Sequence, residues 1–538
     1  MFRFLSIYKF YQINYYRKIL KGYRNLKNID NYKLIFNLKK DLTKVKLNFK
    51  NNIYDKFLFI NYKDFNSEII IRQYILSKFL NSYFNRHILY YYGDNKTKFD
   101  YGYPPEWINL LKKKNIKVNL TKSLFNWKLK TFLSLLDSFR IYLKILLNSL
   151  NNNLIKNINS NTIYISSLTD NLIESSLKGF TTINWIQKFI TEKTKIKHKV
   201  LVESQKKFLY YKQFNEKGIF IDKPFESLKN RYLIIPITFW YLRAFIICLL
   251  DSIFSKGYRA FILTESLKTK VYQLNFKNNK LNYCFYSCSD WIYRPIWTYW
   301  AERNNSNIIF YFYSTNIFQL SQNKNFSFPD IINYGWESNT WKNFYVWNKN
   351  QSDFIKQLPN KANVEIVGPI LFQDDNKKDL SLKKISSKKK LALFDISIFR
   401  NFLFQTEGHL TCYETPEVAI RFITDVLELC IDLDIHILYK SKRDLSKKIH
   451  PKYKSFIRNL SNKYFHFISY DVSPNYLINI SEGCISFPFT STSLLAKFQN
   501  KKCCFYDPTS KLIPYKIQTN NITLIKGKVK LKDWLSSL

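Results

Sequence analysis

Apolar runs of strand length alternate with segments of helical periodicity along most of the chain. The expected strands cover residues 57–60, 87–91, 162–166, 283–287, 308–312, 390–396, 434–439, 464–468, 483–487 and 502–506. The expected helices cover residues 68–80, 295–303, 416–430, 452–462, 474–479 and 491–498. Strands that alternate with helices at this spacing pair in parallel, with helices on both faces of the sheet. The pattern therefore predicts an α/β fold.

One polar seam divides this pattern. Residues 374–389 read DDNKKDLSLKKISSKK and contain almost no large apolar side chains, which is typical of a linker. We expect one α/β unit over residues 51–373 and a second over residues 390–538. Ahead of them, residues 1–50 form an extra segment in which aromatic residues alternate with lysine and arginine, and we expect it to be helical.

Two longer apolar stretches raise the question of a membrane. Residues 232–250 approach the roughly 20 residues that cross a bilayer, and residues 133–150 are similarly apolar with a basic face. Arg243 lies inside the first stretch, where a mid-span arginine costs about 2.5–3.5 kcal/mol, and Pro236 would kink it. A buried or interface-facing helix is therefore favoured over a span, and peripheral contact with an anionic membrane is one expected interaction.

The N-terminal 30 residues leave two alternatives open. Lys9, Arg17 and Lys18 interrupt the apolar run that a signal peptide needs. The segment is either a solvated helix or a basic, aromatic helix on a membrane surface.

The charge is strongly basic but unspecific. There are 84 Lys and Arg against 40 Asp and Glu, a net charge of +44. The basic residues are spread over the whole length, and an excess of Lys, Asn, Ile, Tyr and Phe is what an AT-rich coding sequence produces. We therefore expect no nucleic-acid partner, although +44 alone would invite one.

Composition excludes several classes of protein. With 46% apolar and 23% charged residues, the chain is not intrinsically disordered. Eight scattered cysteines provide neither a disulfide scaffold nor zinc-finger spacing, so we expect reduced thiols and a cytoplasmic protein.

Several familiar motifs are also missing. The sequence contains no GxGxxG, GxxxxGK[ST], HExxH or GxSxG motif, and no DxD pair at a strand end. The chemistry that remains is the binding of phosphate by side-chain cations and helix N-termini. We expect neither a metal nor a resident cofactor.

A cluster of cations follows one of the expected strands. Lys440, Lys442 and Arg443 come directly after the apolar run 435–439. In a doubly wound sheet, ligands bind at the carboxyl ends of the strands. Three cations there would neutralise a diphosphate, with Arg443 able to bind two oxygens at once.

Hydroxyl residues follow another expected strand. Residues 490–493 read TSTS and lead into the helix over 491–498, where exposed amides and the helix dipole favour an anion. Pro488 would hold the strand exit open. Asp507, at the end of the next strand, would cap a turn or hold a sugar hydroxyl. The donor-binding residues predicted here are Pro488, Phe489, Thr490, Ser491, Thr492 and Asp507, together with Lys440, Lys442 and Arg443.

These residues resemble a known family. The segment FPFTSTSLLAKFQNKKCCFYDPTSK, residues 487–511, looks like the signature of the "PFTS motif" polysaccharide biosynthesis proteins, which are assigned to bacterial surface carbohydrate synthesis. Supporting matches are residues 104–107 (PPEW), 293–297 (YRPIW), 312–316 (FYSTN), 346–348 (VWN) and 367–370 (VGPI).

More distantly, the layout resembles GT-B glycosyltransferases. The resemblance implies two Rossmann-like domains facing across a cleft, with residues 51–373 binding the acceptor and residues 390–538 the nucleotide donor. Transferases of this type that act in capsule synthesis often carry a Lys-Pro-His-Pro turn. This chain has Lys440-Ser441-Lys442-Arg443 at that place.

The expected activity is metal-independent transfer of a sugar from a nucleotide-activated donor to a glycan or lipid-linked acceptor, at the inner face of the cytoplasmic membrane. Arg294 and Trp297 are predicted to bind the acceptor. Candidates for the general base are Asp290, Glu302, His409 and Glu414. The alternatives are CDP-linked transfer of glycerol phosphate or sugar phosphate on the same fold, and a non-catalytic glycan-assembly protein.

Overall fold

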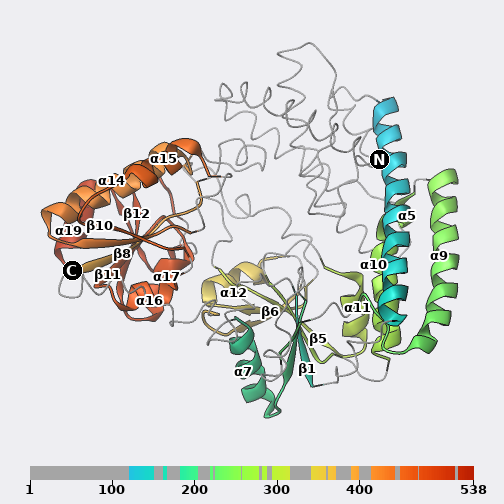
Figure 1. Cartoon of the computed structure of the whole chain (residues 1–538). Helices are drawn as coiled ribbons and strands as arrows, with labels where there is room; N and C mark the ends of the chain where they lie inside the picture. Colours follow the sequence, from blue (N-terminus) through green and yellow to red (C-terminus); the bar gives the residue numbers. More distant parts are fainter. Residues whose placement is uncertain are drawn as a thin grey trace.

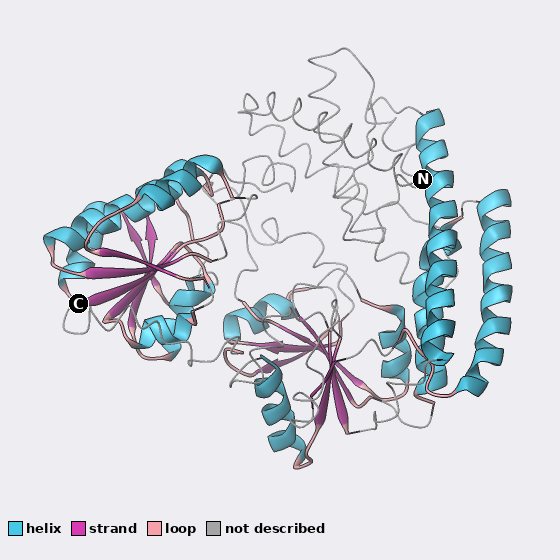
Figure 2. Cartoon of the chain, in the orientation of Figure 1, coloured by secondary structure: helices cyan, strands magenta, loops and turns pink. Residues whose placement is uncertain are grey.

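The computed structural model describes two α/β domains and a layer of long helices (Figures 1 and 2). The described residues are 120–150, 161–166, 182–203, 219–221, 225–255, 257–277, 281–287, 294–314, 341–358, 361–370, 389–398, 413–442, 449–470, 472–514 and 519–538. The segment 1–50, the elements expected at 57–60, 68–80 and 87–91, and all but the last residue of the linker 374–389 lie outside them.

The first domain is a parallel sheet of seven strands in the order β3-β2-β1-β4-β5-β6-β7. Its apolar strands are buried, as expected where helices cover a parallel sheet. The strands are β1 (Thr162–Ile165), β2 (Lys199–Val202), β3 (Ile219–Ile221), β4 (Tyr283–Ser287), β5 (Asn307–Tyr311), β6 (Asn343–Val346) and β7 (Asn363–Ile366). The helices that belong to it are α7 (Thr182–Thr194), α11 (Ile296–Arg303) and α12 (Lys349–Lys356).

The second domain is a parallel sheet of six strands in the order β10-β9-β8-β11-β12-β13. The strands are β8 (Lys390–Phe394), β9 (His436–Lys440), β10 (Phe465–Ile468), β11 (Gly483–Ser486), β12 (Lys502–Asp507) and β13 (Thr523–Lys526). The helices are α14 (Pro416–Asp432), α15 (Pro451–Asn459), α16 (Pro474–Asn479), α17 (Ser491–Phe498) and α19 (Lys528–Ser536). Counted from β8, this is the Rossmann order 3-2-1-4-5-6.

Local chemistry starts several of these helices. Thr415 caps α14 by accepting the Val418 amide, with Pro416 at the first helical position. Asn348 caps α12 in the same way through the Gln351 amide. A proline or an asparagine at the start of a helix can be seen in the sequence, and these caps give the physical reason for its position.

A layer of long helices lies beside the first domain (Figure 1). It consists of α5 (Leu120–Leu150), the 3-10 turn η1 (Arg231–Leu233), α9 (Ile234–Phe254) and α10 (Tyr258–Asn275). Their inner surfaces share one apolar cluster that includes Ile145, Tyr241 and Leu267.

The α/β prediction is confirmed in both domains. The helices expected at 474–479 and 491–498 match α16 and α17, and the expected strands match β1, β4, β5 and β8 to β12 within one or two residues. Strands β2, β3, β6, β7 and β13 had not been anticipated from the sequence.

Among the described residues, polar side chains join the two domains at the start of α12. The side-chain amides of Asn348 and Asn350, at the start of α12, each donate to Oδ1 of Asn520 at 2.9 Å. Asn520 lies ahead of β13, and its backbone carbonyl accepts from Nζ of Lys497 on α17. The start of α12 is thereby connected to the helix that follows the PFTS segment.

Candidate functional site

The second sheet reverses its strand order between β8 and β11. In open α/β sheets, ligands bind outside the carboxyl ends of the strands at such a switch point. The residue after β8 is Asp395, and the residues after β11 are Phe487 to Ser491. The fold therefore places the PFTS residues, 488–491, at the position where this architecture binds ligands.

A tight turn connects β11 to α17. Phe489 has a φ of +62°, and the backbone amide and side-chain hydroxyl of Thr490 both donate to the Phe487 carbonyl. Thr490 is the N-cap of α17, yet its side chain makes no capping hydrogen bond. The turn thus directs the first turn of α17, with Ser491 and Thr492 half-buried, to the carboxyl edge of the sheet.

Two buried serines fix α17 to the sheet. Oγ of Ser486, the last residue of β11, lies 2.5 Å from Oγ of Ser493. Ser493 also donates to the Cys504 carbonyl of β12 at 3.0 Å. Both serines are fully buried. They position the helix start, although the sequence pattern had favoured a ligand contact for the hydroxyl run as a whole.

Lys440 is the last residue of β9 and is buried, with 6% of its surface exposed. Phe394 is the register partner of both Lys440 and Ser486, so the three side chains leave the same face of the sheet. The Lys440 and Ser486 backbones are about 10 Å apart, at about 4.8 Å per strand. The Lys440 side chain therefore leaves the sheet on the α17 face.

Lys442 is exposed, and its backbone amide donates to Oδ1 of Asp395 at 2.9 Å. Arg443, the third predicted cation, lies outside the described residues. The structure thus brings Lys440 and Lys442 to the same edge of the sheet as the PFTS turn.

Asp395 is buried at this edge of the sheet and accepts several hydrogen bonds there. Its Oδ2 accepts hydrogen bonds from the hydroxyls of Tyr439 and Tyr453, at 2.6 and 2.5 Å. Burial raises the pKa of the Asp395 carboxyl, although the two hydroxyls, the Lys442 amide and the Lys440 charge act in the opposite direction. No sequence pattern singled out this residue.

Asp507 is fully buried at the end of β12 and holds its own turn together. Its Oδ1 accepts from the Tyr413 hydroxyl at 2.8 Å and from the Thr509 amide and hydroxyl, and its Oδ2 accepts from the Leu512 amide. The Asp507 carboxylate is thus bonded within the protein, which is the arrangement that the turn-capping alternative describes.

The two predicted acceptor residues are buried in the first domain. Trp297 is 2% exposed and packs edge-on against Tyr164, with its ring centroid 5.4 Å away. Arg294 is 1% exposed and pairs with Glu302 at 2.6 Å, with its guanidinium 4.1 Å from the Tyr299 ring centroid. As placed, these side chains stabilise the α11 region and do not line a surface.

The two general-base candidates that the structure describes, Glu302 and Glu414, lie in different domains. Glu302 sits near the end of α11, where it pairs with Arg294 and Lys342. Glu414 is half-buried just ahead of α14. Asp290 and His409 lie outside the described residues.

A charged cluster that the sequence did not reveal lies at the carboxyl end of β2. Glu203 follows this strand and accepts a hydrogen bond from the Tyr164 hydroxyl. Lys268 of α10 lies 3.5 Å from Glu265, and the pKa of its ammonium is raised by Glu265, Glu203 and Glu226 against the effect of burial. Glu265 is 2% exposed, and neither of its carboxylate oxygens accepts a hydrogen bond from the described residues.

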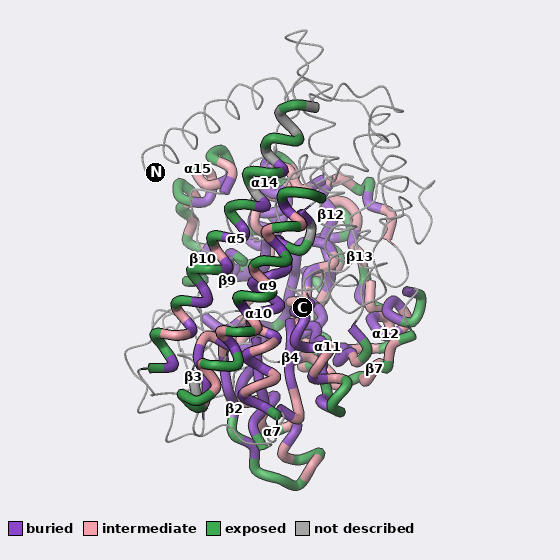
Figure 3. Tube along the Cα trace, turned by 90° about the vertical axis from the view of Figure 1, so that its right-hand side faces the viewer, coloured by how far each residue is buried: buried purple, intermediate pink, exposed green. Residues whose placement is uncertain are grey.

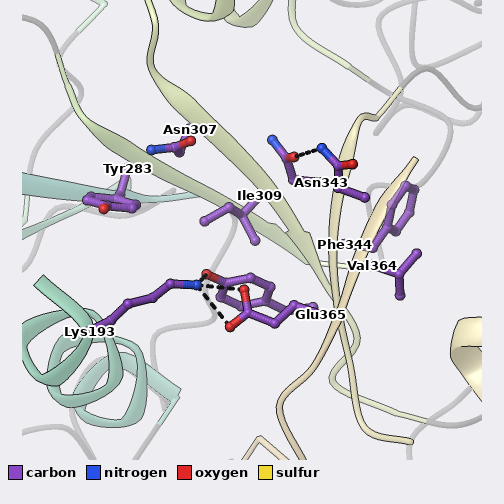
Figure 4. A pocket seen from close by; sticks show the side chains of 10 residues that line it. Lys193, Tyr283, Asn307, Ile309, Asn343, Phe344, Val364 and Glu365 are labelled. Carbon is purple, nitrogen blue, oxygen red and sulfur yellow. Dashed lines mark hydrogen bonds and ion pairs between the residues drawn. The ribbon is translucent and has the colours of Figure 1, made fainter. Parts of the chain in front are cut away.

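A cavity of about 350 Å³ opens at the other edge of the first sheet. Asn307, Asn343 and Asn363 line it from the first positions of β5, β6 and β7. Figure 4 shows Lys193 reaching across it to Glu365, with Nζ 2.7 Å from Oε2. Because it lies at the amino ends of the strands, this cavity is not at the edge where the fold binds ligands. Over the part of the chain that the structure describes, no group of three His, Cys, Asp or Glu side chains could hold a metal ion.

Solved structures with a similar arrangement are distant. They include the glycotransferase of kitacinnamycin, which is 9% identical over 70% of this chain and 89% of that chain with a TM-score of 0.38. The UDP-GlcNAc 2-epimerase from Methanocaldococcus jannaschii, in complex with UDP-GlcNAc and UDP, is 12% identical over 70% and 91% with a TM-score of 0.34. A UDP-glucosyltransferase from Polygonum tinctorium is 8% identical over 70% and 89%, also at 0.34.

Sequence comparison gives a firmer result. No curated protein matches the chain. The family model described as "Polysaccharide biosynthesis PFTS motif protein" matches residues 240–535, which is more than half of the 538 residues and includes all six strands of the second domain. The Pro-Phe-Thr-Ser turn at the switch point is thus the motif that gives the family its name, and the chain belongs to the polysaccharide biosynthesis PFTS motif proteins.

Proposed function

We propose that this protein is a glycosyltransferase-like enzyme that transfers a sugar from a nucleotide-activated donor to a glycan or lipid-linked acceptor. The second domain would bind the donor. One observation carries the proposal: the family motif at residues 488–491 lies at the switch point of a sheet with the nucleotide-binding strand order.

The donor diphosphate would lie against the first turn of α17. Helix N-termini bind phosphate through backbone amides and the positive end of the helix dipole. Thr490 leaves this turn without a side-chain cap, and Lys440 faces the same side of the sheet. Lys440, Lys442 and Arg443 would then stabilise the charge that develops on the leaving nucleotide, which is the role a metal ion has in other transferases.

The acceptor hydroxyl needs a base, and the Glu203–Glu265–Lys268 cluster supplies candidates. It lies at the carboxyl end of the first sheet, the edge at which this kind of domain binds ligands. Glu265 is buried, and its Oε1 lies 3.5 Å from Nζ of Lys268. A carboxylate in that state can accept a proton once a hydroxyl is placed beside it.

The first experiment is a thermal-shift panel of CMP, CDP, UDP, GDP and ADP at fixed salt. It compares the wild type with the Lys440→Met/Arg443→Gln variant, in which the buried stem of Lys440 is kept. A second variant, Lys530→Gln/Lys532→Gln, removes the same charge from two exposed positions of α19. We expect one nucleotide to stabilise the wild type and the α19 variant. Loss of the two charge-assisted contacts should weaken that binding roughly 10- to 100-fold or more.

The outcomes separate the alternatives. Selective stabilisation by CMP or CDP would favour the CDP-linked phosphotransferase on the same fold. Equal weakening in both variants would indicate unspecific charge attraction. No selective shift in a folded sample would overturn the donor site and leave a non-catalytic role.

A further inference from the structure

The exposed surfaces of α5 and α9 are predominantly apolar. Of the 26 large apolar side chains that are exposed among the described residues, 19 lie on α5, η1 and α9. We call these 19 the α5–α9 face, and Figure 3 shows both helices on the side toward the viewer, with exposed positions along each of them. They are Leu124, Phe125, Leu129, Phe132, Leu133, Leu136, Phe139, Leu143, Leu147, Leu150, Tyr232, Ile235, Phe239, Leu242, Ile246, Ile247, Leu250, Ile253 and Phe254.

The apolar cluster between the same helices also contains hydrogen-bonded polar groups. The Tyr142 and Tyr241 rings stack at 4.2 Å, and their hydroxyls bond to Thr238 at 2.9 Å and Ser138 at 3.1 Å. Ser138 is fully buried. A soluble helix pair places polar groups outward and apolar groups inward. Here hydrogen-bonded polar groups join the helices to each other, and the surface left outside is apolar, as in helix pairs that contact lipid.

The helix Arg231–Phe254 has the length and composition to cross a membrane, and only 17% of its apolar window is buried inside the protein. A core helix of a soluble protein would be mostly buried. Its other face, however, packs on α5 and α10 through Ile237 and Tyr241. Arg243 is exposed on the outward side near the middle of the helix, where a span would hold it at the bilayer centre. A helix lying along the surface lets that arginine reach the headgroups.

The charges on these helices suit an anionic surface. Helices α5, η1 and α9 contain seven Lys and Arg residues against two acidic residues, Asp137 and Asp251. Asp137 is paired with Arg140 at 2.7 Å, and Asp251 accepts from the Arg259 amide. Exposed cations among apolar side chains are typical of helices that lie in the interface of anionic membranes.

We propose that the α5–α9 face binds an anionic lipid surface, with both helices lying in the plane of the headgroups. The apolar side chains enter the acyl boundary, and Arg243 binds headgroup phosphate. This inference does not depend on the proposed transferase activity, because no nucleotide or acceptor enters it.

The test is flotation of the full-length protein with vesicles of phosphatidylcholine, with and without phosphatidylglycerol. We expect the wild type to float with the anionic vesicles and more weakly with the neutral ones. Phe239→Asp/Ile246→Asp changes side chains that are 72% and 54% exposed, and it should reduce binding at least tenfold. The matched control, Val529→Asp/Ile366→Asp, changes side chains that are 78% and 53% exposed on α19 and β7, and should bind like the wild type.

Two further measurements test orientation and charge. Arg243→Gln should reduce the preference for anionic over neutral vesicles and leave the apolar contribution. Nitroxide labels at positions 235, 246 and 254 should report one common shallow depth. A span would place the label at position 246 far deeper than the other two.

Several results would overturn the proposal. One is a wild type that floats with neither vesicle, and another is a Phe239→Asp/Ile246→Asp variant that floats as well as the wild type. A wild-type dimer that this variant converts to a monomer would assign the face to a second copy of the chain. A melting temperature lowered by the same substitution without vesicles would mean that another part of the chain covers the face.

Discussion

Ser486 and Ser493 place their hydroxyl oxygens 2.5 Å apart, and this contact joins the last residue of β11 to the first turn of α17. Between them lies the Pro-Phe-Thr-Ser turn. Buried serines therefore flank the family motif on both sides. The geometry of the motif depends on the hydrogen bond between these two serines, and not on a bond from either of them to a ligand.

A double-mutant cycle tests this relationship. Ser486→Ala and Ser493→Ala should each destabilise the folded state by about 1 kcal/mol, because each removes a buried hydrogen bond. The double variant should cost less than the sum, with a coupling of at least about 0.5 kcal/mol. Urea unfolding of the four proteins measures it. Strictly additive losses would show that the two hydroxyls do not act together.

The Asp395 carboxyl should make stability depend on pH. Burial raises its pKa in the folded state above the unfolded value of about 3.9, so the folded protein retains a proton that the unfolded chain releases. Its contribution to stability therefore falls as pH rises from about 3.9 through the folded pKa. Asp395→Asn removes this dependence and also disturbs the bonds from Tyr439 and Tyr453, at a cost of about 1–3 kcal/mol.

The check is urea unfolding of both proteins between pH 4.5 and 7.5. The difference in stability between wild type and Asp395→Asn should be largest at pH 4.5 and should shrink toward pH 7.5. A difference that grows with pH would contradict the raised pKa.

The histidine pair on β9 and β10 should act in the opposite pH direction. Nδ1 of His436 lies 2.9 Å from Nε2 of His466, and burial together with His436 lowers the pKa of His466. Below about pH 6.5 the unfolded chain binds a proton that the folded protein resists, so stability should fall as pH decreases through that value. His466→Gln should flatten this part of the profile. An unchanged slope in that variant would assign the titration to other groups.

Glu265 provides a test that separates catalysis from donor binding. In the proposed reaction, Glu265→Gln should lower the transfer rate roughly 100-fold or more, because general bases contribute about 10²–10⁴. Its nucleotide thermal shift should stay like that of the wild type, because the second domain holds the donor. A variant that loses nucleotide binding, or keeps full activity, would exclude Glu265 as the base. Glu365→Gln, which removes a carboxylate paired with Lys193 at the amino edge of the sheet, is the matched control.

The sequence by itself determined the local elements and the motif. Apolar runs and proline-marked starts located β8 to β12 and the bounds of α16 and α17, because burial in a parallel sheet and helix capping leave short-range signals. The PFTS string placed hydroxyl residues between a strand and a helix. That placement follows from chain order alone.

The tertiary structure decided everything that depends on which elements are neighbours. Strand order put the switch point between β8 and β11, and only long-range pairing sets that order. Packing buried Trp297 and Arg294, whose residue types had indicated an acceptor surface. It also brought Glu203, which follows β2, to Glu265 and Lys268 of α10. Helix α9 is apolar nearly all round, so its sequence could not show which side faces out. That was decided by the polar contacts of Tyr142 and Tyr241, which hold α5 and α9 together and leave their apolar sides exposed.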